Sequence, residues 1–378
     1  MIENKFNPFL LGGYTEPQYF CNRNKEIIEL ANNINSKFNT TIFAMRRLGK
    51  TGLIQHLFYQ LKVKKTVCMY IDIYATQSLK DFTNLLSNCI YQNFPNTKSI
   101  GKQFLEAIKS FRPVVSFDSL SGLPELSLDI SQTKQFEKTI PQLLQFLDSR
   151  NIKIIIAIDE FQQILTYPEK NIEAILRTSV QSLKNINIIF CGSNQTLMHN
   201  IFNTAKRPFY ASCKNLHLDK IANEEYFAFI KNHFTINKRK IANEAIEYIL
   251  EFTFSHTYFT QYICHQLFAT NSKNITLQDT QLICKKALED NAPTFFQFRN
   301  LLTASQWHLL KAIAKSEKLF QPFAKEFISK NNLGSSAIVK RSLESLLQKE
   351  MIHFNNTEQV THYAVYDKFL LRWMQYLP

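Results

Sequence analysis

Apolar runs alternate with amphipathic stretches through the first 219 residues of the chain. Runs with the length of buried strands cover residues 41–43, 66–74, 151–158, 185–192 and 215–218. Between them, apolar side chains recur at helical spacing over residues 79–93, 99–111, 134–149 and 170–184. Near-continuous apolar runs are typical of parallel strands covered on both faces. The alternation therefore predicts a parallel α/β sheet, with residues 112–130 as a hairpin or a long loop.

The pattern changes after residue 218. Residues 220–290 show helical periodicity and no convincing strand, which predicts a small helical lid domain. Residues 301–378 begin with three helical segments, the first opened by Ser305 as its N-cap, and end in two short strands around a polar turn at Asn355. Three helices and a hairpin predict a winged helix-turn-helix. The expected domains are residues 1–219, 220–296 and 297–378.

Composition narrows the class of protein. A hydrophobic content of 45% indicates a globular chain, and no apolar run reaches the roughly 18 residues of a membrane span. The N-terminus lacks the apolar core of a signal peptide. The seven cysteines are scattered without a Cys-x-x-Cys pair, which argues against a zinc site and favours reduced thiols. We therefore expect a cytoplasmic protein.

The formal net charge of +13 is consistent with an acidic partner such as nucleic acid. The basic residues are spread along the chain rather than concentrated in one segment. A generally basic surface explains the charge equally well.

The segment from Ala44 to Thr51 reads Ala-Met-Arg-Arg-Leu-Gly-Lys-Thr, between an apolar run and an amphipathic one. Strand, tight loop and helix are the context of a phosphate-binding loop, whose backbone N–H groups face a polyphosphate. Lys50 is expected to reach the β- and γ-phosphates of ATP, and the Thr51 hydroxyl to bind Mg²⁺. Ala44 stands where the usual motif has glycine, and it fits unless the loop needs a positive φ there.

The apolar run of residues 151–158 ends in Asp159 and Glu160. At the end of a buried strand, an aspartate can hold the Mg²⁺ shell and the next glutamate can orient or deprotonate a water. The alternative is a buried strand whose acidic end is merely solvated. Because this pair accompanies the phosphate loop, the sequence favours an ATP site with Mg²⁺.

Other side chains near these motifs have two interpretations each. Arg46 and Arg47 grip phosphate or pair with a neighbouring acidic side chain. Asn194, which follows the apolar run of residues 185–192, positions the attacking water or closes a turn. The presence of the two motifs favours the first role for Asn194.

Together these motifs resemble the archaeal-type P-loop ATPases of the AAA/STAND group, which are also common in bacteria, and more distantly the origin-recognition ATPases of archaea. The resemblance covers nearly the whole chain. The segments that carry it are residues 20–26, 46–51, 158–162, 192–194, 256–258 and 366–373.

This resemblance implies roles for further residues. Arg23 belongs to the entry motif that helps to seat the adenine, and residues Arg46, Arg47, Leu48, Gly49, Lys50, Thr51 and Gly52 form the nucleotide-binding loop. His256 stands where the family usually has a Gly-His-Pro-Tyr segment in its lid, so it contacts nucleotide or is a partly buried histidine at a helix start.

The chain also departs from the family pattern. Ala44 and Met45 replace a frequent Gly-Pro, and Ala211-Ser212 replaces a frequent Gly-Arg. The second change removes a candidate arginine finger. Arg207 or Arg177 serves instead, or each is a surface or structural arginine.

The resulting expectation is an ATP-binding and ATP-hydrolysing molecular switch. Lys50, Glu160 and Asn194 act on the phosphate and the water, and Thr51 and Asp159 hold Mg²⁺. Turnover is expected to be slow unless a neighbouring subunit or partner supplies an arginine.

Three outputs remain open. They are DNA binding through residues Ser335–Arg341, a nucleotide-regulated protein-binding switch in signalling or defence with possible self-association, and a nucleotide-binding scaffold without turnover.

Overall fold

The computed structural model describes residues 6–62, 66–94, 100–117, 122, 124–128, 133–355 and 361–377. The chain divides into two compact units. Gly13–Asp219 forms the first unit, and Met1–Gly12 together with Lys220–Pro378 forms the second. The chain therefore passes from one unit to the other twice, after Gly12 and after Asp219.

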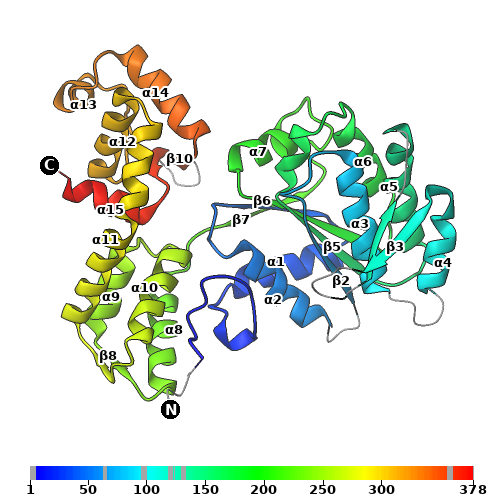
Figure 1. Ribbon diagram of the computed structural model, residues 1–378, viewed down its shortest axis with the longest axis horizontal. Coiled ribbons are helices and arrows are strands. Elements are labelled where there is room, and N and C mark those ends of the chain that lie inside the picture. Colours follow the sequence, from blue (N-terminus) through cyan, green and yellow to red (C-terminus); the bar gives the residue numbers. More distant parts are fainter. Residues whose placement is uncertain are drawn as a thin grey trace. The chain divides into compact units, whose positions relative to one another are not determined.

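The first unit is built on a five-stranded sheet with the strand order β2-β5-β6-β1-β7. Its strands are β1 (Thr40–Ala44), β2 (Val67–Asp72), β5 (Ile154–Asp159), β6 (Ile186–Gly192) and β7 (Lys214–Leu218). Every pairing within this sheet is parallel. The predicted parallel α/β sheet is confirmed (Figure 1).

Helices cover both faces of this sheet (Figure 1). They are α1 (Asn24–Asn35), α2 (Lys50–Lys62), α3 (Leu79–Asn93), α4 (Ile100–Ala107), α5 (Thr133–Asp148), α6 (Ile172–Gln181) and α7 (Gln195–Asn203). Short 3₁₀ turns lie at η1 (Pro17–Tyr19), η2 (Lys109–Phe111) and η3 (Phe161–Thr166).

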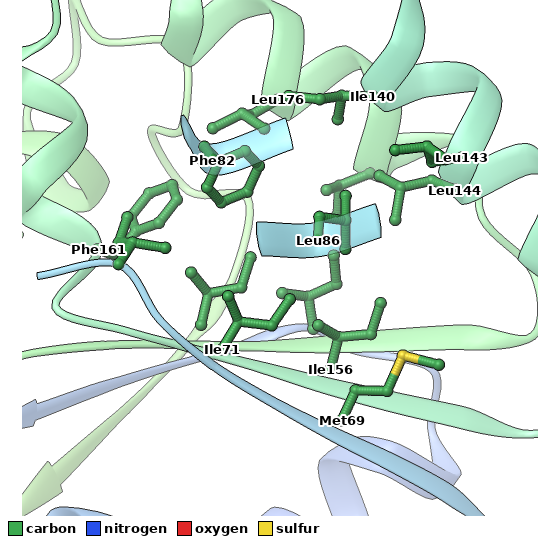
Figure 2. Packing of buried hydrophobic residues seen from close by; sticks show 14 of the residues in the cluster. Met69, Ile71, Phe82, Leu86, Ile140, Leu143, Leu144, Ile156, Phe161 and Leu176 are labelled. Atoms are coloured by element: carbon green, nitrogen blue, oxygen red, sulfur yellow. The ribbon is translucent and has the colours of Figure 1, made fainter. Parts of the chain in front are cut away.

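The position of the inner strand β5 explains why its sequence is uninterruptedly apolar. Ile154, Ile156 and Ile158 belong to one core and the alternating Ile155 and Ala157 to another, because successive side chains of a strand point to opposite faces. Figure 2 shows the first core, in which strand residues such as Met69 and Ile71 meet Phe82 and Leu86. Both faces are buried, so no polar alternation is left in the sequence.

A hairpin of β3 (Pro113–Phe117) and β4 (Pro124–Leu128) is inserted before α5, which confirms the hairpin alternative for that region. The backbone N–H groups of Leu126 and Leu128 donate to the side-chain oxygens of Asn88 and Asn84 at 3.1 and 3.0 Å. The two asparagines lie one turn apart on α3, so they attach β4 to that helix.

The second unit begins with helices α8 (Asn223–Ile236), α9 (Asn243–Phe252), α10 (Thr257–Ala269) and α11 (Leu277–Leu301). Two-residue strands β8 (Lys240–Ile241) and β9 (Asn274–Ile275) pair in parallel. The expectation of no strand within residues 220–290 is therefore wrong in detail, because two residues are too few to produce a periodic pattern.

The N-terminal segment is fixed to these helices. The Asn7 side chain donates to the backbone oxygen of His265 at 3.1 Å, and the Phe9 backbone oxygen lies 2.9 Å from Nδ1 of the same histidine. The Phe9 ring is fully buried, with the rings of Phe234 and Phe268 centred 5.3 and 6.0 Å away. A single aromatic side chain thus anchors the start of the chain in the helical unit.

The C-terminal part of this unit has the predicted helices and hairpin. Its elements are α12 (Ala304–Ser316), α13 (Lys325–Lys330), α14 (Ser336–Gln348), β10 (Ile352–Asn355), β11 (His362–Val365) and α15 (Lys368–Tyr376). β10 and β11 are antiparallel, and most of the predicted turn between them lies outside the described residues.

The start of α12 corrects one prediction. Its N-cap is Thr303, not Ser305, because Thr303 and Gln306 form a reciprocal capping box. The predicted domain boundary between residues 296 and 297 falls inside α11. Among the described residues, no helix combines the length and apolar character that crossing a membrane requires.

Lys368, the first residue of α15, is only 4% exposed. Its ammonium donates to the Val365 backbone oxygen at 2.7 Å and lies 5.7 Å from the centre of the Phe254 ring. Within the described part of the chain it has no ion-pair partner. Burial, with a smaller contribution from nearby Lys220, lowers the pKa of Lys368 to about 7.

We predict that Lys368→Met stabilises the protein at pH 7. In the unfolded chain a lysine has a pKa of about 10.4, so between pH 7 and 10 the unfolded state binds the proton that the folded state lacks. This lysine therefore costs most stability at and below pH 7, and its cost falls by about 1.4 kcal/mol per pH unit as the pH rises. Thermal melts at pH 7, 8, 9 and 10 should show the advantage of the variant shrinking.

The control is Lys349→Met, which changes an exposed lysine of the same unit. A constant difference between wild type and Lys368→Met across this pH range would contradict the prediction.

Candidate nucleotide site

The loop between β1 and α2 has the geometry expected of a phosphate loop. β1 ends at Ala44 and α2 begins at Lys50, so the helix N-terminus directly follows the loop. Ala44 is fully buried and is not among the positive-φ residues, which are Arg47 at 60° and Gly49 at 95° in this loop. The replacement of glycine by Ala44 therefore introduces no backbone strain.

Lys50 lies between the two carboxylates predicted with it. Its ammonium is 2.5 Å from Oδ1 of Asp159 and 3.2 Å from Oε1 of Glu160, and its side chain is 9% exposed. Burial alone would lower the pKa of Lys50, but the adjacent negative charges more than offset this effect and raise it. The lysine is therefore held in its charged form, as a phosphate ligand must be.

Asp159 is the last residue of β5 and is buried. Its Oδ2 accepts from the Tyr70 hydroxyl at 2.5 Å and lies 3.4 Å from Oγ1 of Thr51. A carboxylate and a hydroxyl side by side are hard oxygen ligands, which Mg²⁺ prefers. Phosphate and water oxygens would complete the coordination shell of the ion. Tyr70, on the neighbouring strand β2, was not predicted. It pairs with Ala157, two residues before Asp159, so its closeness to Asp159 follows only from the pairing of β2 with β5.

Glu160 follows β5 with a left-handed φ of 54°. Its Oε2 accepts from Nε2 of Gln162 at 2.6 Å, from the Ser193 hydroxyl at 2.7 Å and from the Ser193 backbone N–H at 3.3 Å. Burial would raise the pKa of this carboxyl, but Lys50 and these hydrogen bonds hold it below its usual value. Glu160 is therefore an ionised group with a fixed orientation.

Asn194 and Ser193, which follow β6, have different hydrogen-bond partners. Oδ1 of Asn194 accepts from the Leu197 backbone N–H at 3.0 Å and caps α7, which is the turn-closing alternative. Its neighbour Ser193 is the residue that contacts Glu160. A role of Asn194 toward water stays a prediction.

Comparison with known families places these residues in context. Residues 20–258 match the model of an ATPase domain found predominantly in Archaea, and residues 293–376 match a probable winged helix domain. The first match covers more than half of the chain. This protein belongs to that family of archaeal-type ATPases. No curated protein sequence matches the chain.

Solved structures agree with this assignment of the fold. The ATPase is similar to the Walker-type ATPase PABY2304 of Pyrococcus abyssi, with a TM-score of 0.67 and 15% identity over 97% of this chain and 99% of that one. It is also similar to the ORC2 protein of Aeropyrum pernix, solved as ADPNP–ADP complexes, with a TM-score of 0.57 and 12% identity over 98% of each chain. The predicted P-loop core and C-terminal winged helix are confirmed.

Arg23 supports the phosphate loop of this ATPase. Its buried guanidinium donates to the Leu48 backbone oxygen at 3.1 Å and to the Asp219 backbone oxygen at 2.6 Å, and it pairs with Glu26 at 3.0 Å. These contacts connect the entry segment, the loop and the end of β7. A direct contact of Arg23 with adenine stays a prediction.

The remaining loop residues divide into buried and exposed positions. Leu48 is buried, and a methyl group on Gly52 would lie 3.4 Å from the Phe20 ring. Nε of Arg46 donates to the Ser193 hydroxyl at 3.2 Å, while Arg47 is exposed. Arg46 is therefore hydrogen-bonded to Ser193, which in turn donates to Glu160.

His256 belongs to the other unit. It occupies the N-cap position of α10, is 1% exposed, and its ring centre lies 4.9 Å from that of Phe259. This position corresponds to the alternative of a buried histidine at a helix start. Its contact with nucleotide stays a prediction.

The two candidate arginine fingers lie in the ATPase core. Arg207 pairs with Glu173 at 2.7 Å. Arg177 lines a cavity of about 210 Å³ with Tyr210 and Cys213. Asn39 and Cys213, which also line the cavity, precede β1 and β7. Lys50 and Asp159 lie instead beyond the carboxyl end of β1 and at the carboxyl end of β5. A finger role for either arginine stays a prediction.

We predict that Gly192→Ala impairs the site. A Cβ at this position would lie 2.1 Å from Oε1 of Gln162 and 2.7 Å from Sδ of Met198, so Gln162 has to move away from Glu160. Overpacking should cost roughly 1–3 kcal/mol of stability, and the misplaced carboxylate should lower phosphate release by about tenfold or more.

Thermal melts and a phosphate-release assay check both effects. Gly12→Ala is the control, because its added methyl group meets nothing within 4 Å. Unchanged activity in Gly192→Ala would show that the contact between Gln162 and Glu160 is dispensable.

Proposed function

We propose that this ATPase binds ATP with Mg²⁺ at the carboxyl ends of β1 and β5 and hydrolyses it as a nucleotide-dependent switch of the AAA/STAND type. The observation that supports this proposal is the position of the Lys50 ammonium, within 3.2 Å of both Asp159 and Glu160. Lys50 then holds the β- and γ-phosphates, and Glu160 orients the attacking water.

Thr51 and Asp159 are the residues that would hold the metal. Mg²⁺, when bound, neutralises charge that develops on the phosphate oxygens. Tyr70 bonds the same Asp159 oxygen that Thr51 approaches, so it sets the direction in which the carboxylate points. No cluster of three or more metal-binding side chains occurs among the described residues, and none is required when phosphate and water supply the other ligands.

Slow turnover is part of the proposal. Arg207 is already paired with Glu173, and the family's other arginine position is Ser212. An arginine from a partner or a second subunit would then stabilise charge on the transferred phosphate. Such dependence suits a switch rather than a motor.

DNA is the proposed partner of the winged helix. α14 begins with exposed Ser335 and Ser336 and carries exposed Lys340 and Arg341, while its apolar side faces the core. Exposed hydroxyls and cations on one helix are suited to phosphate contacts. Ser345 does not belong to this surface, because it accepts from Gln306 at 2.9 Å and joins α12 to α14.

A protein partner is the alternative, and one observation favours it. Phe320, Phe323 and Phe354 in the winged helix are 48, 45 and 40% exposed. Large exposed aromatic side chains are more typical of protein interfaces than of phosphate contacts. A nucleotide-regulated signalling or defence switch would use such a surface.

We predict that Lys50→Ala abolishes phosphate release from ATP by removing the phosphate ligand. Glu160→Gln should retain ATP binding and lose about 100-fold in turnover, because the amide cannot accept a proton from water. Phosphate release and equilibrium ATP binding measure the two effects.

Lys62→Ala is the matched control, since this exposed lysine lies in the last turn of the same helix. ATP binding by wild type without any release of phosphate would instead support a scaffold without turnover.

We also predict that duplex DNA binds and stimulates phosphate release. The double variant Lys340→Glu/Arg341→Glu should weaken binding, and wild-type affinity should fall steeply with salt concentration because phosphate contacts release counterions. Fluorescence anisotropy at several salt concentrations tests this.

The control Lys285→Glu/Lys286→Glu makes the same change of charge at exposed positions of α11. Equal losses in both double variants would indicate a general basic surface, and no affinity in wild type would favour the protein partner.

A further inference from the structure

A chain of hydrogen bonds runs from the phosphate loop to Glu160. Nε–H of Arg46 donates to Oγ of Ser193 at 3.2 Å, and the Ser193 hydroxyl donates to Oε2 of Glu160 at 2.7 Å. A serine hydroxyl has one proton and two lone pairs. Since its proton is used by Glu160, its oxygen is available to accept from Arg46, and the direction of both bonds is consistent.

Gln162 holds the same carboxylate oxygen from another direction. Its Nε2 donates to Oε2 of Glu160 at 2.6 Å, while its own Oε1 is buried without a hydrogen-bond partner among the described residues. A buried acceptor without a hydrogen bond is unfavourable, because it has lost its contact with water. Rotating the amide would place this oxygen against the carboxylate, so the orientation of Gln162 is dictated by Glu160.

The backbone provides the space for this arrangement. Gly192 precedes Ser193, and the position of its absent Cβ is only 2.1 Å from Oε1 of Gln162. The end of β6 therefore accommodates Gln162 through one residue and binds Glu160 through the next. These contacts connect two neighbouring strands at the edge of the sheet where Lys50 lies.

We propose that Ser193 and Gln162 are positioning residues for Glu160, and that Arg46 of the phosphate loop acts on Glu160 through the Ser193 hydroxyl. This inference rests on the proposed hydrolysis of ATP. The neighbouring Asn194, whose expected role toward the attacking water stays a prediction, caps α7.

The two carboxylate oxygens of Glu160 have different partners, and this difference determines which oxygen can face the attacking water. Oε1 contacts Lys50, whereas Oε2 has three donors from Ser193 and Gln162. When Lys50 binds phosphate, Oε1 is released and Oε2 stays held. Oε1 is then the oxygen that faces the attacking water, in a direction set by Ser193 and Gln162.

The test compares Ser193→Ala, Ser193→Thr and Gln162→Met with wild type in phosphate release and ATP binding. Ser193→Ala should lower kcat roughly tenfold and change the Kd for ATP less than about twofold, since only the orientation of Glu160 is affected. Ser193→Thr keeps a hydroxyl and should restore most of kcat. Ser149→Ala is the control, because it removes the hydroxyl of an exposed serine that donates to the Phe146 backbone oxygen before the amino end of β5.

The split between kcat and the Kd for ATP, together with recovery in Ser193→Thr, separates positioning from a merely structural effect. Gln162→Met removes the other side-chain donor to Oε2 and should likewise lower kcat while changing the Kd for ATP less than about twofold. An unchanged kcat, a matching loss of ATP affinity, or no recovery in Ser193→Thr overturns the proposal.

The Arg46 connection has its own test. Arg46→Gln should slow wild type, but it should slow Ser193→Ala little further, because both changes break the same chain of bonds. If the double variant Arg46→Gln/Ser193→Ala loses activity by the product of the two single losses, this connection is wrong.

Wild type and Glu160→Gln in the same assay distinguish a failure of ATP hydrolysis from a failure of the positioning of Glu160. If wild type releases no phosphate, the proposed hydrolysis fails and the inference fails with it. If release depends on Glu160 but Ser193→Ala behaves as wild type, only the inference is wrong.

Discussion

The contact of a buried lysine ammonium with two carboxylates is the constraint on which the rest of the ATPase core depends. Lys50, Asp159 and Glu160 come from segments more than 100 residues apart, and each would be costly to bury alone. Their proximity requires β1 and β5 to end at the same edge of a parallel sheet. The pairing of both strands with β6 provides this arrangement, and the apolar cores on both faces maintain it.

The backbone near this cluster is unusual as well. Arg23, Arg47 and Glu160 all have left-handed φ angles, between 54 and 72°. Such conformations in non-glycine residues cost free energy and persist where the surroundings determine them. For Arg23 and Glu160, the hydrogen bonds that hold the side chain can be named. Arg23 is held by the backbone oxygens of Leu48 and Asp219, and Glu160 is held by Lys50, Gln162 and Ser193. Left-handed backbone and buried charge therefore occur together at this site, although other left-handed residues lie elsewhere among the described residues.

The sequence was sufficient for the sheet, the phosphate loop and the acidic strand end, because these depend on local patterns: an apolar run, a Gly-Lys-Thr triplet, and acidic residues after a strand. It was insufficient where function depends on the partner across the sheet. Nothing in the residues around Tyr70 or Ser193 shows that their hydroxyl groups meet Asp159 and Glu160.

The distinction between Ser193 and Asn194 shows the same limit. Both are polar residues at a strand end, and which of them faces the site depends on where α7 begins. Likewise, the capping box of Thr303 competes with the Ser305 signal two residues later, and reciprocal bonding with Gln306 decides between them.

The burial of Phe9 among the helices of the second unit has a consequence for how the protein can be dissected. Because residues before Gly12 belong with residues after Lys220, the second unit is discontinuous in sequence, and the first is inserted into it. A fragment that starts at residue 220 would lack the aromatic side chain that Phe234 and Phe268 surround. The core, in contrast, is one continuous segment, so it can be excised whole or replaced by a linker that joins its two ends. In evolutionary terms, such an arrangement lets the inserted core change while the host unit keeps its own packing.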